Sequence, residues 1–414
     1  MEQARYIPRL IDRVAEETLS DLPAVLLVGP RASGKTTTAR RLARSSIRLD
    51  RPAEAAAVRL DPDAAITGQD EPLLIDEWQM APEILGAGKR AIDDEPRPGR
   101  FILTGSVRAE LTDAGWPATG RVVRLPMFGL TQRELTGGVL GSSLIDRLFQ
   151  PDIASHPLPA VVPDLRGYVG LALSSGFPDA ALASSDRARS RWLRSYADQV
   201  VRRDARAAGQ DRDPVRLRAY LAAIATNTAG TPDHRTLYEA VAINRRTAEA
   251  YDTLLEMLFV TERIPAWATN RLARLTRAPK RYLIEPALLG PLVGLDVQGA
   301  MRDGDVLGRL IDTFVVAQLR AELEVCEPSV SMSHVRLEHG RREVDLLLEA
   351  PDGRVVGIEI TATSAPTRDM ARHLSWLRDE LGTTFVQGVL FHTGPRAFHL
   401  DERITALPIC AFWG

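Results

Sequence analysis

Several chemically useful residue types are scarce in this 414-residue sequence. Its two cysteines, Cys326 and Cys410, lie far apart and form no C-x-x-C pair. A disulfide framework and a cysteine-ligated zinc site are therefore excluded, and a reducing compartment is favoured. No run approaches the ~18 consecutive apolar residues of a membrane-spanning helix, and no apolar segment follows the first residues. We therefore expect a cytoplasmic protein with no membrane partner.

Lysine is also rare, since only Lys35, Lys89 and Lys280 contribute to a total of 52 lysines and arginines. The formal net charge is −2, which excludes a general attraction to nucleic acid and leaves only a local basic patch for that purpose. A hydrophobic fraction of 45% and a charged fraction of 26% are typical of a globular protein. The length allows two or three domains.

One of the three lysines stands in the pattern G-x-x-x-x-G-K-[ST], which residues 29–36 match. An apolar run at residues 24–28 precedes the pattern and predicts a buried strand, and the residues after it suit a helix. This context predicts a phosphate-binding loop at a helix N-terminus. We expect Lys35 to reach the β- and γ-phosphates of ATP and the Thr36 hydroxyl to ligate Mg²⁺. The expected nucleotide-binding residues are Gly29, Pro30, Arg31, Ala32, Ser33, Gly34, Lys35, Thr36 and Thr37.

A second apolar run ends in two carboxylates, Asp76 and Glu77. Ligands bind at the carboxyl ends of strands in open α/β sheets, so both acids are expected at the nucleotide. Asp76 is expected in the Mg²⁺ shell, and Glu77 is expected to orient or deprotonate the attacking water. Thr104, at the end of the next apolar run, could contact the γ-phosphate or that water. Capping of the following turn is an equally good interpretation of Thr104.

The alternation of strand and helix patterns predicts a parallel sheet with helices on both faces, hence an α/β P-loop NTPase domain. The segments GPRASGKT, LLIDEWQ, FILTGS and Thr119-Gly120-Arg121 occur in the order, and at roughly the spacing, of a family of prokaryotic AAA+ ATPases, a branch of the ASCE class. The chain resembles this family over nearly its whole length, including a C-terminal region long labelled a domain of unknown function.

The resemblance implies roles for individual residues. It implies a sensor role for Thr104 and a γ-phosphate-sensing or finger role for Arg121. Arg121 could act in its own subunit or in a neighbouring one, and only the second alternative would require a homo-oligomer. Ala32 departs from the family, which commonly has glutamine there, and Trp78 replaces a smaller aliphatic residue. Neither departure removes a catalytic group.

We expect four regions along the chain. They are an ATPase domain (1–135), a linker and helical region (136–213), a winged-helix-like domain (214–290) and an α/β PD-(D/E)XK-like domain (305–414).

Residues 234–258 have helix-turn-helix spacing, with Asn244, Arg245 and Arg246 at the start of the second helix. Two short strand patterns, 259–263 and 280–284, then suit the wing of a winged helix. From Arg263 to Arg281, both included, the sequence has six basic residues and no acidic one. Basic groups in these places are what phosphate and groove contacts require. Winged helices in ATPases also serve as internal packing modules, so both interpretations stand.

The last region resembles the PD-(D/E)XK nuclease fold, which ends the chains of this family. The resemblance places Asp312, Asp345 and Glu359 in the nuclease site, where active members bind Mg²⁺ and carry a lysine two positions after the glutamate. Here that position is Thr361, and no lysine follows Lys280. We therefore expect a vestigial site that lacks the required ammonium and does not cut DNA.

Three functions remain open from the sequence. The first is an Mg²⁺-dependent ATPase that acts on DNA through a basic winged helix. The second is a nucleotide-switched module that docks a protein partner through its C-terminal regions. The third, a DNA nuclease, requires the C-terminal region to be active. DNA-stimulated nucleotide turnover is predicted by the first alone.

Overall fold

The computed structural model describes residues 6–107, 120–150, 152–204, 213–268, 277–327, 329–337 and 341–414. The chain divides into two compact units. The first comprises residues 1–130 and 253–260, and the second comprises residues 131–252 and 261–414.

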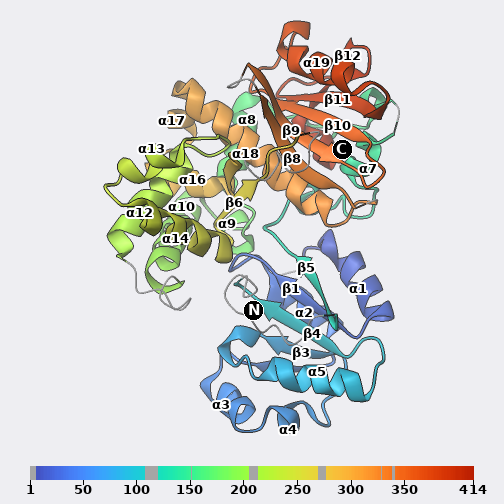
Figure 1. The fold of residues 1–414 in the computed structure, drawn as a ribbon, viewed down its shortest axis with the longest axis vertical. Helices are drawn as coiled ribbons and strands as arrows, with labels where there is room; N and C mark the ends of the chain where they lie inside the picture. Colours follow the sequence, from blue (N-terminus) through green and yellow to red (C-terminus); the bar gives the residue numbers. More distant parts are fainter. Residues whose placement is uncertain are drawn as a thin grey trace. The chain divides into compact units, whose positions relative to one another are not determined.

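The first unit is built on a five-stranded sheet in which every pairing is parallel (Figure 1). Its strands are β1 (Ala24–Val28), β2 (Ser45–Arg48), β3 (Leu73–Asp76), β4 (Phe101–Gly105) and β5 (Val122–Pro126), in the order β2-β3-β4-β1-β5. Strands β1, β3 and β4 are buried along their whole length, as the uninterrupted apolar runs predict for a parallel sheet. This order places the carboxyl ends of β3 and β4 beside the loop that follows β1.

Five α-helices lie wholly within the described part of this unit, and α2 packs on β1, β3 and β4 while α1 packs on β1 and β5. The helices are α1 (Ile11–Asp21), α2 (Lys35–Leu42), α3 (Pro52–Leu60), α4 (Pro62–Ile66) and α5 (Ile84–Asp94). Helix α2 begins at the lysine of the loop, so its N-terminus faces the carboxyl edge of the sheet.

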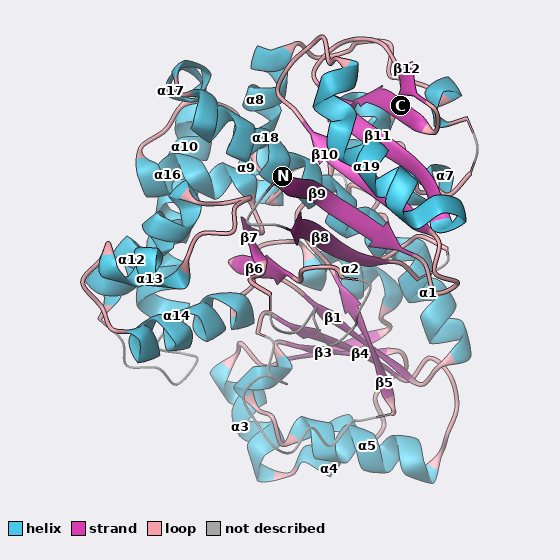
Figure 2. Ribbon diagram, turned by 45° about the horizontal axis from the view of Figure 1, so that its top comes forward, coloured by secondary structure: helices cyan, strands magenta, loops and turns pink. Residues whose placement is uncertain are grey.

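The second unit begins with a helical region (Figure 2). Its helices are α6 (Gln132–Leu135), α7 (Leu144–Leu148), α8 (Leu165–Ser174), α9 (Pro178–Ala181), α10 (Asp186–Gln199), α12 (Pro214–Thr226), α13 (His234–Glu239), α14 (Arg245–Met257), α16 (Leu289–Val293) and α17 (Val297–Arg302). Residues 253–257 at the end of α14 are counted with the first unit. A two-stranded antiparallel ribbon of β6 (Thr261–Ile264) and β7 (Lys280–Leu283) follows α14.

A long helix, α18 (Gly304–Leu323), leads into a mixed six-stranded sheet that is crossed by α19 (Arg372–Leu381). The strands are β8 (Ser331–Leu337), β9 (Arg342–Glu349), β10 (Val355–Ile360), β11 (Phe385–His392), β12 (Phe398–Asp401) and β13 (Ile404–Pro408), in the order β12-β13-β11-β10-β9-β8. Strands β9 and β10 pair antiparallel, and β10 pairs parallel with β11. Their inner faces form a core with α19.

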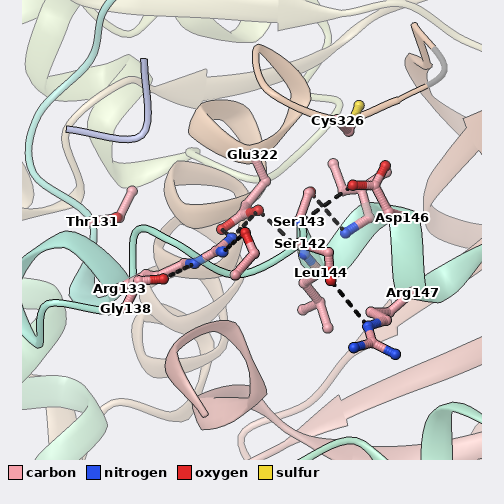
Figure 3. A network of polar contacts seen from close by, with 12 residues as sticks. Thr131, Arg133, Gly138, Ser142, Ser143, Leu144, Asp146, Arg147, Glu322 and Cys326 are labelled. Carbon is pink, nitrogen blue, oxygen red and sulfur yellow. Dashed lines mark hydrogen bonds and ion pairs between the residues drawn. The ribbon is translucent and has the colours of Figure 1, made fainter. Parts of the chain in front are cut away.

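A buried ion pair fixes α18 against the start of the second unit (Figure 3). Arg133 donates to both carboxylate oxygens of Glu322 at 2.9 Å and to the carbonyl of Gly138 at 2.8 Å. The backbone amide of Leu144 donates to the same carboxylate at 3.2 Å. Because Thr131 caps α6 and that helix carries Arg133, the short helices α6 and α7 are held against α18.

The expected fold class is confirmed: an N-terminal P-loop sheet, a helical middle and a C-terminal α/β sheet region. Among the described residues, no helix is both long and apolar enough to cross a membrane.

Candidate functional site

The loop after β1 has the backbone shape that its glycines predict. A side chain at Gly29 would place its Cβ 2.0 Å from the carbonyl oxygen of Met127, so only glycine fits. Gly34 adopts a φ of +98°, a conformation that glycine tolerates and other residues resist. Ala32 adopts a φ of +60°, so a non-glycine residue also occupies the left-handed region within this loop.

The lysine of the loop is buried, and within the described residues no carboxylate accepts a hydrogen bond from it. Its ammonium donates to the carbonyl oxygens of Gly29, at 3.0 Å, and Pro30, at 2.8 Å. Burial lowers the pKa of Lys35 to about 8. A cation that faces neutral carbonyls inside a protein is poorly compensated, so an anion placed here would be bound strongly.

Three predicted residues meet at the carboxyl end of the sheet. The hydroxyls of Thr36 and Thr104 both donate to Oδ1 of Asp76, at 2.7 and 2.6 Å. The Thr104 hydroxyl also accepts the backbone amide of Glu77 at 3.0 Å. Thr104 therefore joins β4 to the end of β3, and this hydroxyl contacts the neighbouring strand rather than the turn that follows β4.

The second carboxylate, Glu77, is held by two residues that the sequence analysis did not single out. The Ser106 hydroxyl donates to Glu77 Oε2 at 3.1 Å, and the side-chain amide of Gln79 donates to the same oxygen. Glu77 itself has a φ of +56°, which turns the chain sharply after β3. One carboxylate oxygen of Glu77 is thus fixed by polar contacts from its own loop and from the segment after β4.

The sequence analysis also missed Arg9, a buried residue just before α1. Its guanidinium donates to the carbonyls of Ser33 and Phe128, each at 2.8 Å. Nearby, the Tyr6 hydroxyl lies 2.9 Å from the Thr38 hydroxyl of α2. These contacts hold the phosphate loop from the N-terminal side. In the sequence, only the position of Arg9 and Tyr6 before the phosphate loop could have indicated their role, because arginine is common throughout this chain.

Arg121 does not lie near the loop. It precedes β5, whose first residue Val122 pairs with Ala24 at the start of β1, whereas the phosphate loop follows the end of β1. The length of β5, about 13 Å at ~3.3 Å per residue, therefore separates Arg121 from the loop edge. Arg121 instead donates to Asp93 at 2.9 Å. A phosphate role within its own chain does not fit this position, and only the neighbouring-subunit alternative remains a prediction. Thr119 lies outside the described residues.

The residues present suit a nucleotide with its metal. The buried Oγ of Ser33 has no hydrogen-bond partner within the described part of the chain, and the Lys35 ammonium faces only carbonyls. A polyphosphate would satisfy both groups. The Thr36 hydroxyl and the Asp76 carboxylate are oxygen ligands of the kind that Mg²⁺ prefers.

The residues expected to contact DNA lie at the start of α14. Asn244 accepts the backbone amide of Thr247 at 2.8 Å and thereby caps the helix. Arg245 and Arg246 are exposed, and Arg245 pairs with Glu249 at 2.7 Å.

Two of the basic residues counted on the wing are buried. Arg281 forms a two-pronged ion pair with Asp252 at 2.7 and 2.8 Å, and Lys280 is buried in β7. For these two cations the structure favours the packing interpretation, because both are buried. Residues 269–276 of the expected wing lie outside the described residues.

The three acids expected in the vestigial nuclease site lie together, and the ammonium of a lysine contacts two of them. Lys280 donates to Asp312 Oδ2 at 2.8 Å and to Asp345 Oδ1 at 2.9 Å. Burial alone lowers the pKa of Lys280, but the two carboxylates outweigh burial and raise it well above its ordinary value. Burial and the adjacent Asp345 raise the pKa of Glu359 well above its ordinary value.

The expectation that this site lacks a lysine is therefore wrong, because β7 supplies one from outside the expected domain. The scarcity of lysine in the sequence could have marked Lys280 as a candidate site residue, since the same argument identified Lys35.

Comparison with known proteins supports the nucleotide site of the first unit and assigns no role to the second unit. Residues 21–136 match a family model described as "AAA domain". Residues 166–299 and 307–412 match models described as "Domain of unknown function (DUF8612)" and "Domain of unknown function (DUF4143)".

Two similar proteins are "Uncharacterized protein Rv2008c" of Mycobacterium tuberculosis and "Uncharacterized protein Mb2031c" of Mycobacterium bovis. Each is 29% identical over 391 residues, covering 93% of this chain and 80% of the relative. The N-terminal match, together with the loop and sheet geometry, supports an AAA-type, nucleotide-binding ATPase module, followed by two regions that match families of unknown function.

Proposed function

We propose that this protein is an Mg²⁺-dependent ATPase that uses nucleotide hydrolysis to act on or with DNA. The observation that carries the ATPase part is the convergence of the Thr36 and Thr104 hydroxyls on one oxygen of Asp76, beside a buried Lys35 whose ammonium donates to two loop carbonyls. Such a group of residues at the carboxyl edge of a parallel sheet suits a nucleoside triphosphate.

The chemistry assigns one task to each side chain. Lys35 offsets negative charge on the β- and γ-phosphates, and Glu77 orients a water molecule in line with the γ-phosphorus and takes its proton. A new bond forms between the water oxygen and phosphorus while the bond to the bridging oxygen of ADP breaks. Thr36 and Asp76 would hold Mg²⁺, which would neutralise phosphate charge when bound. Thr104 fixes the position of the Asp76 carboxylate and of the Glu77 backbone through its two hydrogen bonds.

Nucleotide turnover by the purified chain tests this proposal. Phosphate release should require Mg²⁺ and ATP and should be absent in Lys35→Ala. The Glu77→Gln variant should still bind nucleotide but hydrolyse it far more slowly. Turnover by Glu77→Gln at the parent rate would contradict the assignment of Glu77.

The DNA part of the proposal rests on the order of elements in residues 214–290. Helix α12, an isolated antiparallel bridge from Gly230 to Arg281, α13, α14 and the β6–β7 ribbon follow one another as in a winged helix. In such domains the third helix enters the major groove with its N-terminal residues. The exposed Arg245 and Arg246 stand at that position in α14.

DNA binding measured over a range of salt concentrations tests this second part. The contacts are arginines without a base-reading array, so binding should be sequence-tolerant and should weaken steeply with salt. The Arg245→Ala/Arg246→Ala variant should weaken binding and reduce the slope against log salt by about two. Arg187→Ala/Arg191→Ala, on the exposed face of α10, is a control with the same change in charge. If only the control variant loses affinity, the site belongs to α10.

A nucleotide-switched interaction protein remains the second candidate. A cavity of about 920 Å³ between α8, α10 and residues 287–298 favours it, because it offers a recessed surface outside the nucleotide site. ATP turnover that is unchanged by single- or double-stranded DNA would favour this candidate over the first.

A further inference from the structure

The buried guanidinium of Arg9 bridges two segments of the first unit that are far apart in the sequence. Its Nη1 donates to the carbonyl of Ser33 in the phosphate loop at 2.8 Å, and its Nη2 donates to the carbonyl of Phe128 after β5 at 2.8 Å. Arg9 is only 6% exposed, so both hydrogen bonds form in surroundings of low dielectric, where they are stronger than in water. The side chain therefore ties the loop to the segment that follows β5.

That segment also lies along the beginning of the loop. The backbone amide of Met127 donates to the carbonyl of Val28 at 2.7 Å, and a Cβ at Gly29 would lie 2.0 Å from the carbonyl oxygen of Met127. Met127 and Phe128 are both buried. The loop is thus held against this segment at two points, at its first residue by close packing and at its fifth residue by Arg9.

Arg9 is itself held in place through Asp12, in the first turn of α1. The backbone amide of Arg9 donates to Asp12 Oδ2 at 2.9 Å, and the Tyr6 hydroxyl donates to Asp12 Oδ1 at 2.7 Å. Arg41 of α2 pairs with the same carboxylate at 2.8 Å and lies over the Tyr6 ring, 4.1 Å from its centroid. Because α2 continues directly from the phosphate loop, Arg9 is anchored to the same helix that carries the loop.

The carbonyl that Arg9 holds belongs to the peptide group between Ser33 and Gly34, which is trans. In a trans peptide the C=O and N–H bonds point in opposite directions, so a fixed Ser33 carbonyl also fixes the direction of the Gly34 amide. Loops of this kind bind phosphate with successive backbone amides at a helix N-terminus. A hydrogen bond from a charged donor also polarises the peptide group, which makes its amide a stronger donor.

We propose that Arg9 is a positioning residue of the nucleotide site, which sets the shape of the phosphate loop before the nucleotide binds. In this role Arg9 contacts no phosphate. Its bridge between Ser33 and Phe128 removes backbone freedom that the loop would otherwise lose on binding, and such preorganisation raises affinity by lowering the entropic cost of association. This role rests on the proposed nucleotide binding of the first unit and adds to it a residue outside the loop and strand motifs.

The charge of Arg9 also acts on the site. Burial is the main cause of the low pKa of Lys35, and the nearby guanidinium groups of Arg31 and Arg9 lower this pKa further. Arg9 thus adds positive potential near the loop, and a lysine in its place would retain that charge. A lysine carries its donors on one nitrogen, so it does not reproduce the planar fork that reaches two carbonyls from two nitrogens. The bridge and the charge can therefore be separated by substitution.

Binding of a fluorescent ADP analogue with Mg²⁺ to the full-length protein, at a temperature where every variant is folded, tests this role. Arg9→Met should weaken the affinity by about ten- to hundredfold, while kcat at saturating ATP falls much less. Inorganic pyrophosphate, used as a competitor, should lose affinity by the same factor, because Arg9 acts on the phosphate loop. Arg9→Lys should recover less than about half of the loss on a logarithmic scale. Arg13→Met removes an exposed arginine of α1 and should bind ADP like the parent.

A folded Arg9→Met that binds ADP with parent affinity would overturn the positioning role. Full recovery in Arg9→Lys, or an equal loss in Arg13→Met, would also overturn it, because charge alone would then explain the effect. Should Arg9→Met fail to fold, Arg9→Lys decides: weaker ADP binding supports the role, and parent affinity overturns it.

The same measurements separate this role from the proposed function. A parent protein that binds ADP but does not hydrolyse ATP contradicts the ATPase assignment and leaves the role of Arg9 to be decided by the affinities of the variants. A parent protein that binds no nucleotide overturns both.

Discussion

The chain buries two of its three lysines, one in each compact unit, and their ammonium groups face opposite surroundings. Within the part of the chain that the structure describes, Lys35 donates only to the neutral carbonyls of Gly29 and Pro30, and burial lowers its pKa to about 8. Lys280 is bonded to two carboxylates, which raise its pKa well above the ordinary value despite burial.

This difference separates a ligand-binding cation from a structural one. A buried ammonium that donates to no carboxylate retains electrostatic free energy that a bound phosphate can release. An ammonium between carboxylates has already released it during folding. Removal of Lys35 should therefore affect chemistry with little cost in stability, and removal of Lys280 should affect stability with little cost in ATP turnover.

The largest expected effect is on catalysis in the first unit. Lys35→Ala should reduce ATP turnover by about 10³-fold or more, and Glu77→Gln by about 10²- to 10⁴-fold with nucleotide binding retained. Steady-state phosphate release and fluorescent-nucleotide titration measure the two properties. Lys89→Ala, at the partly exposed third lysine, is the matched control and should keep parent turnover.

The next largest effect is on the stability of the second unit. Lys280→Met leaves two carboxylates buried without their cation and should lower the free energy of unfolding by about 3–5 kcal/mol. Urea unfolding measures this loss, and ATP turnover of the folded fraction should stay at the parent value. Lys89→Met should have little effect because its partner Asp93 is exposed. Equal losses in the two variants would remove the distinction between the lysines.

Arg121 tests whether the first site is complete within one chain. If a neighbouring subunit supplies this arginine, Arg121→Ala should reduce turnover by about 10²-fold without changing nucleotide affinity, and parent turnover should rise with protein concentration. Asp93→Asn removes the partner of Arg121 and is the control. Equal losses of thermal stability in both variants, with turnover unchanged, would show a purely structural pair.

The smallest effect is a pH dependence that only Lys35 should cause. Between its folded pKa of about 8 and its ordinary value of 10.5, the nucleotide-free protein has released a proton that the unfolded chain retains. The stability of the nucleotide-free protein should therefore rise over this range. Nucleotide affinity should fall, by at most about tenfold per pH unit, because phosphate binds the ammonium form.

Calorimetry in buffers of different ionisation enthalpy measures this linkage as proton uptake on nucleotide binding. Uptake should be larger at about pH 8.5 than at about pH 7.5. Lys280 contributes no such signal, because its raised pKa keeps the ammonium charged and its stabilisation present below the unfolded pKa. Uptake that is identical at both pH values would contradict the low pKa of Lys35.

Much of the first unit could be predicted from the sequence because its signals are local. The loop of residues 29–36 and the end of β3 are short segments whose residue types are set by backbone shape and by phosphate chemistry. Gly29 illustrates the point, since any Cβ there would meet Met127. Apolar runs likewise predicted the buried parallel strands.

Other features depended on which distant segments come together. The strand order β2-β3-β4-β1-β5 places Thr104 against Asp76, and the register of β5 places Arg121 at the far edge from the loop. Pattern alone indicates a strand but neither its neighbour nor its register, so the within-chain role of Arg121 could not be judged from sequence.

The second unit shows the same limit most clearly. The sequence by itself determined that only three lysines exist and which acids follow apolar runs. Only the tertiary structure decided that Lys280, on a ribbon before α18, supplies the positive charge between Asp312 and Asp345. The physical reason is that a buried charge is compensated by whichever opposite charge lies near it in space, and sequence distance sets no limit on that choice.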